Sequence, residues 1–114
     1  MEQLHWMILM FDDLAIKLHK VAVEKGFWDQ EVDDIFISKQ LMMIVSEVVE
    51  VLEAVRKDKG EEEISKEFAD ILIRTLDLYA GMVESGYTKI SLDYAFDKKT
   101  KFNETRPEKH GVRF

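Results

Sequence analysis

The stretch IVSEVVEVLEAVRKDKGEEEISKEFADILIRTLDL, from Ile44 to Leu78, decides the fold of this chain. Its apolar residues recur at spacings of three and four on both sides of Gly60, which predicts two helices, the first beginning near Asp33 or Asp34. Valine is frequent in the first half and lowers helix propensity, so a strand is the competing local interpretation. Length and periodicity favour helix. Because the link is short, we expect the two helices to be antiparallel neighbours.

Four acids lie within these two helices, in two pairs with a spacing of i, i+3: Glu47 with Glu50, and Glu67 with Asp70. On a helix this spacing places both carboxylates of a pair on one face. The residues around each pair are apolar on nearly every side, and a charged acid in such surroundings is costly unless it is compensated. Either cations compensate the four acids, or some of the acids face solvent as ordinary polar residues of a helix.

The rest of the chain predicts two further helices. An apolar pattern from Leu4 to Lys25 predicts a helix that ends at Gly26. Ser91 is a suitable N-cap for a last helix, which ends at Pro107. The expected fold is all-α: a single domain over residues 1–114, with four antiparallel helices of bundle type. The two central helices are apolar around more of their circumference than one chain can cover, so we expect an assembly of more than one chain.

Composition excludes several classes of protein. The absence of cysteine excludes disulfides and thiolate metal sites. The net charge of −7 argues against binding to nucleic acid. The early apolar run from Trp6 to Phe11 is too short for a signal sequence or a membrane span, so no membrane partner is expected. A cytoplasmic location is the default expectation.

The charge is distributed unevenly along the chain. Residues 98–114 contain six Lys or Arg residues and two Glu residues, a net charge of +4, so the other 97 residues carry −11. A basic end on an acidic body suits a ligand that is anionic and also needs a metal. A solvated basic tail is the simpler interpretation, and charge alone does not decide between them.

Oxygen ligands without thiolate or histidine suit a hard cation, Mg²⁺ or alternatively Mn²⁺. Such ions keep open positions for substrate phosphates, so the acid pairs are typical of phosphoryl chemistry. A di-iron carboxylate site would need two Glu-x-x-His pairs, and the sequence has one, Glu2-x-x-His5. His5 and His19 fall on the first helix and are interpreted as surface or core residues. Arg74 is placed to pair with Asp70, its i+4 neighbour, in a structural salt bridge.

These motifs resemble one family. Glu47-x-x-Glu50, sixteen residues and then Glu67-x-x-Asp70 is similar to the signature of the MazG-like all-α nucleoside triphosphate pyrophosphohydrolases, a superfamily that includes dimeric dUTPases and dCTP pyrophosphatases. The similarity covers about residues 26–114 and is most specific in the tail, Lys-x-x-x-Asn-x-x-Arg-Pro-x-x-His-Gly, which begins at Lys99. One departure is Ser46, which stands where many relatives have the first Glu of Glu-Glu-x-x-Glu.

The resemblance implies an enzyme that hydrolyses (deoxy)nucleoside triphosphates, with dNTPs expected, to the monophosphate and pyrophosphate with Mg²⁺, as nucleotide-pool house-cleaning. It implies assembly into a homo-oligomer, either a dimer or a dimer of dimers (a homotetramer). It also implies metal binding by Glu47, Glu50, Glu67 and Asp70, with Glu47 and Glu50 as the catalytic pair. It implies that Lys99, Asn103 and Arg106 contact the phosphates and sugar. We add two substrate-binding residues, Trp28, whose aromatic face suits a base, and His110 of the tail motif. For Trp28 the competing interpretation is packing over the end of the core. The alternative is a non-catalytic helical oligomer that binds nucleotides or a partner protein.

Overall fold

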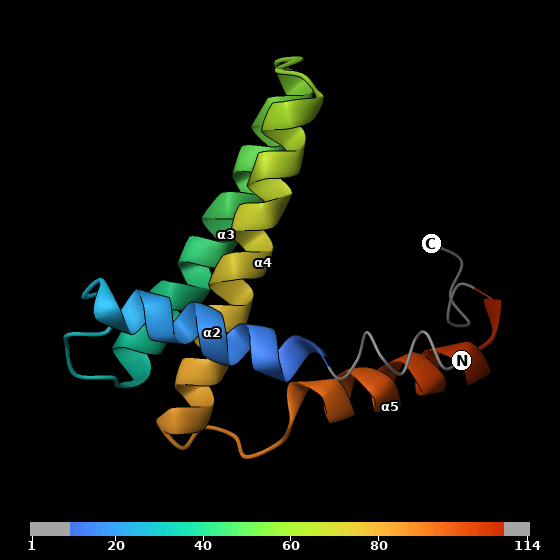
Figure 1. The fold of residues 1–114 in the computed structure, drawn as a ribbon. Coiled ribbons are helices and arrows are strands. Elements are labelled where there is room, and N and C mark those ends of the chain that lie inside the picture. The colour runs from blue at the N-terminus through green and yellow to red at the C-terminus, as the bar shows by residue number, and fades with distance from the viewer. Residues whose placement is uncertain (1–9, 109–114) are drawn as a thin grey trace.

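The computed structural model describes residues 10–108 of the chain (Figure 1). The described elements are the helices α2 (Met10–Glu24), α3 (Asp34–Arg56), α4 (Glu61–Glu84) and α5 (Leu92–Thr105), and residues 10–108 contain no strand. The all-α class is therefore confirmed, and the valine-rich segment is helical. His5 and His110 lie outside the described residues. No helix in the described part combines the length and hydrophobicity that a membrane crossing requires.

Local signals in the sequence set the helix ends. Asp33 caps α3 by accepting a hydrogen bond from the backbone N–H of Phe36 at 2.9 Å. Ser91 caps α5 in the same way, through the N–H of Tyr94. Gly26 follows the end of α2 at a φ of +85°, a conformation that glycine adopts without steric cost. The predicted starts of α3 and α5 are thus confirmed.

The helices α3 and α4 lie side by side as a long hairpin, which the short link at residues 57–60 closes (Figure 1). The helix α2 crosses α4 at the end of the hairpin away from that link. The helix α5 begins beside the start of α2 and extends away from the hairpin. Hence α5 packs against α2, and the part of the hairpin nearest the link has no other described helix across it. The closure of the helices into an antiparallel bundle and their assembly into an oligomer remain predictions.

The hydrophobic core is small and lies between the first half of α3, the last turns of α4 and the loop that follows α2. Phe36, Ile37 and Leu78 form its buried centre. The partly buried side chains packed against this centre are Trp28, Val32, Ile44 and Met82. Trp28 therefore connects the loop after α2 to the core between α3 and α4.

Large apolar side chains remain exposed along both helices of the hairpin. On α3 they include Val48 and Leu52, which are about half exposed, and on α4 they include Phe68 and Leu72. A monomeric soluble protein rarely exposes so continuous an apolar surface. Within the described part of a single chain, nothing packs over these apolar faces. This agrees with the expectation that the protein is an oligomer.

Two acids join α2 to α5 by capping each other's helix. Asp93 accepts hydrogen bonds from the backbone N–H groups of Phe11 and Asp12, in the first turn of α2. Asp12 in return accepts from the N–H groups of Leu92 and Asp93 and from the hydroxyl of Ser91. Burial and the neighbouring Asp12 raise the pKa of Asp93. Burial also acts to raise the pKa of Asp12, but its hydrogen bonds outweigh burial and lower that pKa.

Asp12→Ala should destabilise the protein by about 1–2 kcal/mol, because it leaves first-turn N–H groups of α5 without an acceptor. Urea unfolding followed by circular dichroism measures the change. Asp13→Ala is the matched control, since Asp13 is an exposed acid in the same first turn of α2. Equal losses in the two variants would show that Asp12 acts only through its charge at the start of α2.

Candidate metal centre

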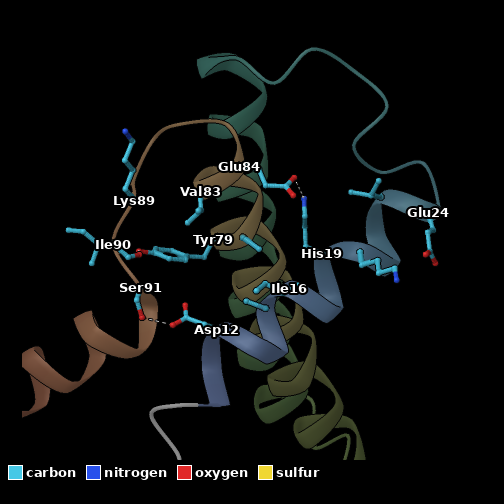
Figure 2. Close-up of a pocket in the computed structure, with 14 residues that line it drawn as sticks. Asp12, Ile16, His19, Glu24, Tyr79, Val83, Glu84, Lys89, Ile90 and Ser91 are labelled. Atoms are coloured by element: carbon cyan, nitrogen blue, oxygen red, sulfur yellow. Dashed lines mark hydrogen bonds and ion pairs between the residues drawn. The ribbon is translucent and has the colours of Figure 1, made fainter.

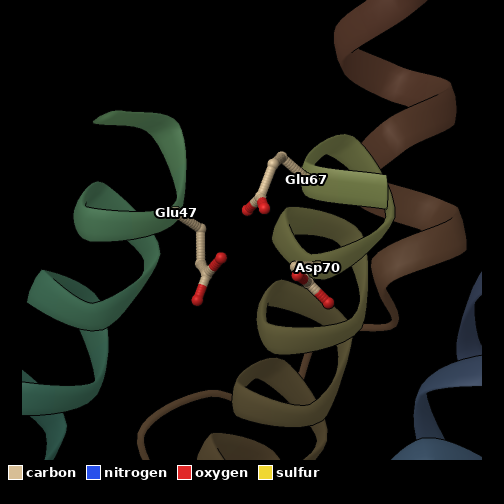
Figure 3. A group of neighbouring side chains, drawn as sticks. All are labelled: Glu47, Glu67 and Asp70. Carbon is tan, nitrogen blue, oxygen red and sulfur yellow. The ribbon is translucent and has the colours of Figure 1, made fainter. Parts of the chain in front are cut away.

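Three carboxylates from two helices converge at one point of the hairpin (Figure 3). Glu47 extends from α3, and Glu67 and Asp70 extend from neighbouring turns of α4. One oxygen atom from each carboxylate lies within 4.8 Å of one oxygen atom from each of the other two. Glu67 is only 8% exposed, and Glu47 and Asp70 are half-buried. We call these three residues the acid triad.

The surroundings of Glu67 disfavour its charged form. Its pKa is raised, first by burial, then by a hydrogen bond with Glu63 and by the negative charges of Asp70, Glu63 and Glu47. A bound cation reverses this effect, because its positive charge stabilises every ionised carboxylate that it contacts. The acid triad is therefore an arrangement that a cation would stabilise.

Arg74 supplies one positive charge to this cluster. Its Nε donates a hydrogen bond of 3.0 Å to Oε1 of Glu47, across the contact between α4 and α3. The interpretation of Arg74 as the i+4 partner of Asp70 is wrong, since the guanidinium pairs with the opposite helix instead. None of the ion pairs found within residues 10–108 includes Glu67 or Asp70. A divalent cation would supply the positive charge that these two carboxylates lack.

The donor set of the acid triad fits a hard cation. It offers carboxylate oxygens alone, and oxygen ligands suit Mg²⁺ or Mn²⁺ better than the softer transition metals. Three carboxylates leave coordination positions for water and for substrate oxygens. The chemistry that this arrangement permits is the activation and charge neutralisation of a phosphate group.

A pocket of about 470 Å³ adjoins the acid triad. Asp70 belongs to its lining, so the pocket and the triad share this residue. Arg74, the partner of Glu47, also lines the pocket. The loop after α2 contributes Phe27, which is 65% exposed, and Trp28. Lys25, Lys39 and Gln40 add two cations and an amide. Aromatic surface, positive charge and a neighbouring cation site together suit an anionic ligand with a planar ring.

The comparisons with known proteins agree with this chemistry. The family model for the MazG nucleotide pyrophosphohydrolase domain matches residues 37–110, well over half of the chain. The chain belongs to the MazG family. No curated protein and no solved structure matches it. The matched range begins in α3 and includes the acid triad, α4 and α5.

The fourth predicted acid of the MazG domain, Glu50, is not part of the acid triad. It lies on α3 three residues after Glu47 and is exposed. Its role as a metal ligand or catalytic residue remains a prediction.

The predicted phosphate-binding residues of the MazG domain lie on or beside α5. Lys99 and Asn103 are exposed, and Arg106 is half-buried just after the helix. Lys99 and Arg106 both lie over the ring of Phe102, at 5.2 and 5.5 Å from its centroid. Because α5 packs against α2, the described chain does not bring these residues to its own acid triad. Their assignment to the substrate remains a prediction, as does that of His110.

Sequence analysis missed how Asp77 contributes to this site. Asp77 lies in the pocket lining and accepts a hydrogen bond of 3.0 Å from the indole Nε1 of Trp28. The signal was present, because Asp70, Arg74 and Asp77 are spaced i, i+4, i+7 and so share one face of α4.

The raised pKa of Glu67 gives a pH-dependent stability. The native state binds this proton more tightly than the unfolded chain does, so Glu67 costs stability as the pH rises through its native pKa. In metal-free protein, lowering the pH from 7 towards the ordinary pKa of a glutamate, about 4.3, should recover that loss, and at pH 7 excess Mg²⁺ should raise the Tm.

The measurement is thermal unfolding with and without EDTA over this pH range. Other carboxylates have their own pH dependence, so the contribution of Glu67 is the difference between wild type and Glu67→Gln. We expect this difference to shrink on acidification. A difference independent of both pH and Mg²⁺ would contradict the prediction.

Proposed function

We propose that this MazG domain is a Mg²⁺-dependent pyrophosphohydrolase that converts a nucleoside triphosphate, expected to be a dNTP, to the monophosphate and pyrophosphate. The observation that carries the proposal is the convergence of Glu47, Glu67 and Asp70 in a chain of this family. The proposal assigns the three carboxylates to Mg²⁺, with Mn²⁺ as the alternative ion, and keeps Glu50 as a fourth candidate ligand. The bound ion would neutralise phosphate charge and lower the pKa of a coordinated water.

Side chains of the protein would then activate the water and bind the substrate. Glu47 or Glu50 would orient the attacking water and accept its proton, and Arg74 holds Glu47 in a fixed position for this role. The bond between the α and β phosphates would break, and the pyrophosphate would leave. The pocket beside the triad would take the base and sugar, with Phe27 and Trp28 as its aromatic surface. Its volume of about 470 Å³ is in the range of small-molecule pockets.

The proposed role of the tail residues requires a particular arrangement of the subunits. Lys99, Asn103 and Arg106 can contact phosphates at an acid triad only if α5 of one subunit reaches the pocket of another. The apolar faces that α3 and α4 leave exposed support association into a dimer or a dimer of dimers. Light scattering coupled to gel filtration measures the assembly directly.

The activity is tested with a panel of the eight common NTPs and dNTPs, assayed for pyrophosphate with Mg²⁺, with Mn²⁺ and with EDTA. Release of pyrophosphate from at least one dNTP, and its loss in EDTA, is the expected result. Binding of a nucleotide without product after long incubation would replace the enzyme with a non-catalytic nucleotide-binding oligomer. Full activity in EDTA would remove the metal from the proposal.

Complementation tests the role of α5 in a second subunit. Glu67→Gln and Lys99→Ala should each be inactive alone as homo-oligomers. Co-expression of the two variants should restore part of the activity, because mixed assemblies contain one site with an intact triad and an intact α5. Activity that stays absent in isolated mixed oligomers would place Lys99 and the triad of the same chain in one site, or remove Lys99 from the site.

A further inference from the structure

His19 is a buried titratable residue that the proposed mechanism does not use. It lies on α2, is 6% exposed, and contacts two carboxylates of α4 with its two ring nitrogens. Its Nδ1 lies 2.8 Å from Oδ1 of Asp77, and its Nε2 lies 3.1 Å from Oε2 of Glu84. Both bonds can be donated together only by the imidazolium ring, because a neutral ring carries a single N–H.

The contact with Asp77 continues to Trp28. The same Oδ1 atom of Asp77 that faces His19 accepts the hydrogen bond from the indole Nε1 of Trp28. The rings of His19 and Trp28 also touch, with centroids 4.6 Å apart and planes at 79°. Trp28 also packs against Phe36, with ring centroids 5.2 Å apart. Its ring lies so close to Gly81 that there is no room for a side chain at that position. The indole is therefore held from several directions.

The two ends of this chain of contacts face different pockets. His19 and Glu84 line a pocket of about 840 Å³ between α2, the end of α4 and the link to α5 (Figure 2). Trp28 and Asp77 line the pocket beside the acid triad, and His19 is absent from that lining. His19 can therefore influence the proposed nucleotide site only through Asp77 and Trp28.

We propose, resting on the proposed function, that His19 is a positioning residue: its Nδ1 contact fixes Asp77, and Asp77 fixes the indole of Trp28 as the wall of the nucleoside pocket. Because the Nε1 donor of Trp28 is engaged by Asp77, the indole offers the substrate its ring surface and no hydrogen bond. Trp28 thus favours a ligand with a planar ring that can stack on the indole, and other groups distinguish one base from another. The contact between Nε2 and Glu84 is secondary, since the Glu84 side chain is 73% exposed.

Two polar variants separate the two contacts of His19. In His19→Asn the side-chain amide can replace Nδ1, so the contact to Asp77 is kept and that to Glu84 is lost. In His19→Gln the longer side chain places its amide near Nε2, so the contact to Glu84 is kept instead. Lys20→Gln is the control, because Lys20 is the exposed neighbour of His19 on α2. All three substitutions put a polar side chain on a helix, and circular dichroism verifies that the fold is retained.

The first readout is the ¹H–¹⁵N resonance of the Trp28 indole Nε1–H, assigned with Trp28→Phe. It should stay at its wild-type position in Lys20→Gln. Both His19 variants lose the ring that touches the indole, so they are compared with each other, and the resonance should lie closer to its wild-type position in His19→Asn than in His19→Gln. The second readout is hydrolysis of the best nucleotide of the panel. In His19→Gln we expect KM to rise about tenfold, the effect of one lost hydrogen bond to a charged group, with a much smaller change in kcat.

Equal resonances in His19→Asn and His19→Gln would overturn the proposal, as would a shift of the resonance without a change in KM. If the wild-type protein hydrolyses no nucleotide, the proposed function fails. The resonance then still decides whether His19 positions Trp28, and the affinity for a non-hydrolysable dNTP analogue replaces KM.

Discussion

Glu67→Gln should lower Mg²⁺-dependent pyrophosphate release by at least about a hundredfold, while the helical content is retained. Glu67 is the most buried member of the acid triad, and its carboxylate lies between those of Glu47 and the same helix's Asp70. A neutral amide is a poorer ligand for Mg²⁺ than a carboxylate. The same change removes repulsion among the acids, so the metal-free variant should melt at a higher temperature than the wild type.

Glu62→Gln is the matched control, since Glu62 is an exposed acid in the first turn of the same helix. It should keep the wild-type rate. Comparable losses in the two variants would mean that net charge matters and the triad does not. Glu50→Gln extends the series: a loss close to that of Glu67→Gln would assign Glu50 to the site, and a near-normal rate would remove it.

Gly81→Ala should destabilise the protein by about 1–3 kcal/mol, although alanine is the better helix former. Gly81 is buried in α4, and a Cβ atom there would overlap with Cη2 of Trp28 and lie 2.5 Å from its Cζ2. The indole cannot retreat without loss, because Asp77 and Phe36 hold it. Urea unfolding at one fixed protein concentration measures the change.

A double-mutant cycle isolates the steric cause. In a Trp28→Leu background the ring atoms that meet the new Cβ are absent, so Gly81→Ala should become neutral or stabilising by up to about 1 kcal/mol. The sign of the effect therefore depends on residue 28. An equal loss in both backgrounds would show that the cost arises from some other contact of α4.

The helices could be predicted from the sequence because their signals are local. The caps at Asp33 and Ser91, the stop at Gly26 and the three-four apolar pattern each act within a few residues. The hairpin followed from its short link, and with it the approach of Glu47 to the acids of α4. Those features depend on chain connectivity and helix periodicity, which the sequence states directly.

The rest depends on how the helices rotate and cross, which no local pattern determines. The rotation of α3 turns Glu47 towards α4 and leaves Glu50 exposed, and it also gives Arg74 a partner across the hairpin that competes with its i+4 neighbour. The contact between His19 and Asp77 joins residues 58 positions apart. Such pairs form only once α2 has taken its place across α4.

The reciprocal capping by Asp12 and Asp93 has a consequence for the motions of the molecule. Each acid protects amide hydrogens at the start of the other's helix, so neither helix can fray at that end without releasing the other. The amides of Phe11 and Leu92, which are remote in the chain, should therefore exchange with deuterium at matched rates. This pair would open as one cooperative unit, separate from the hairpin that carries the acid triad.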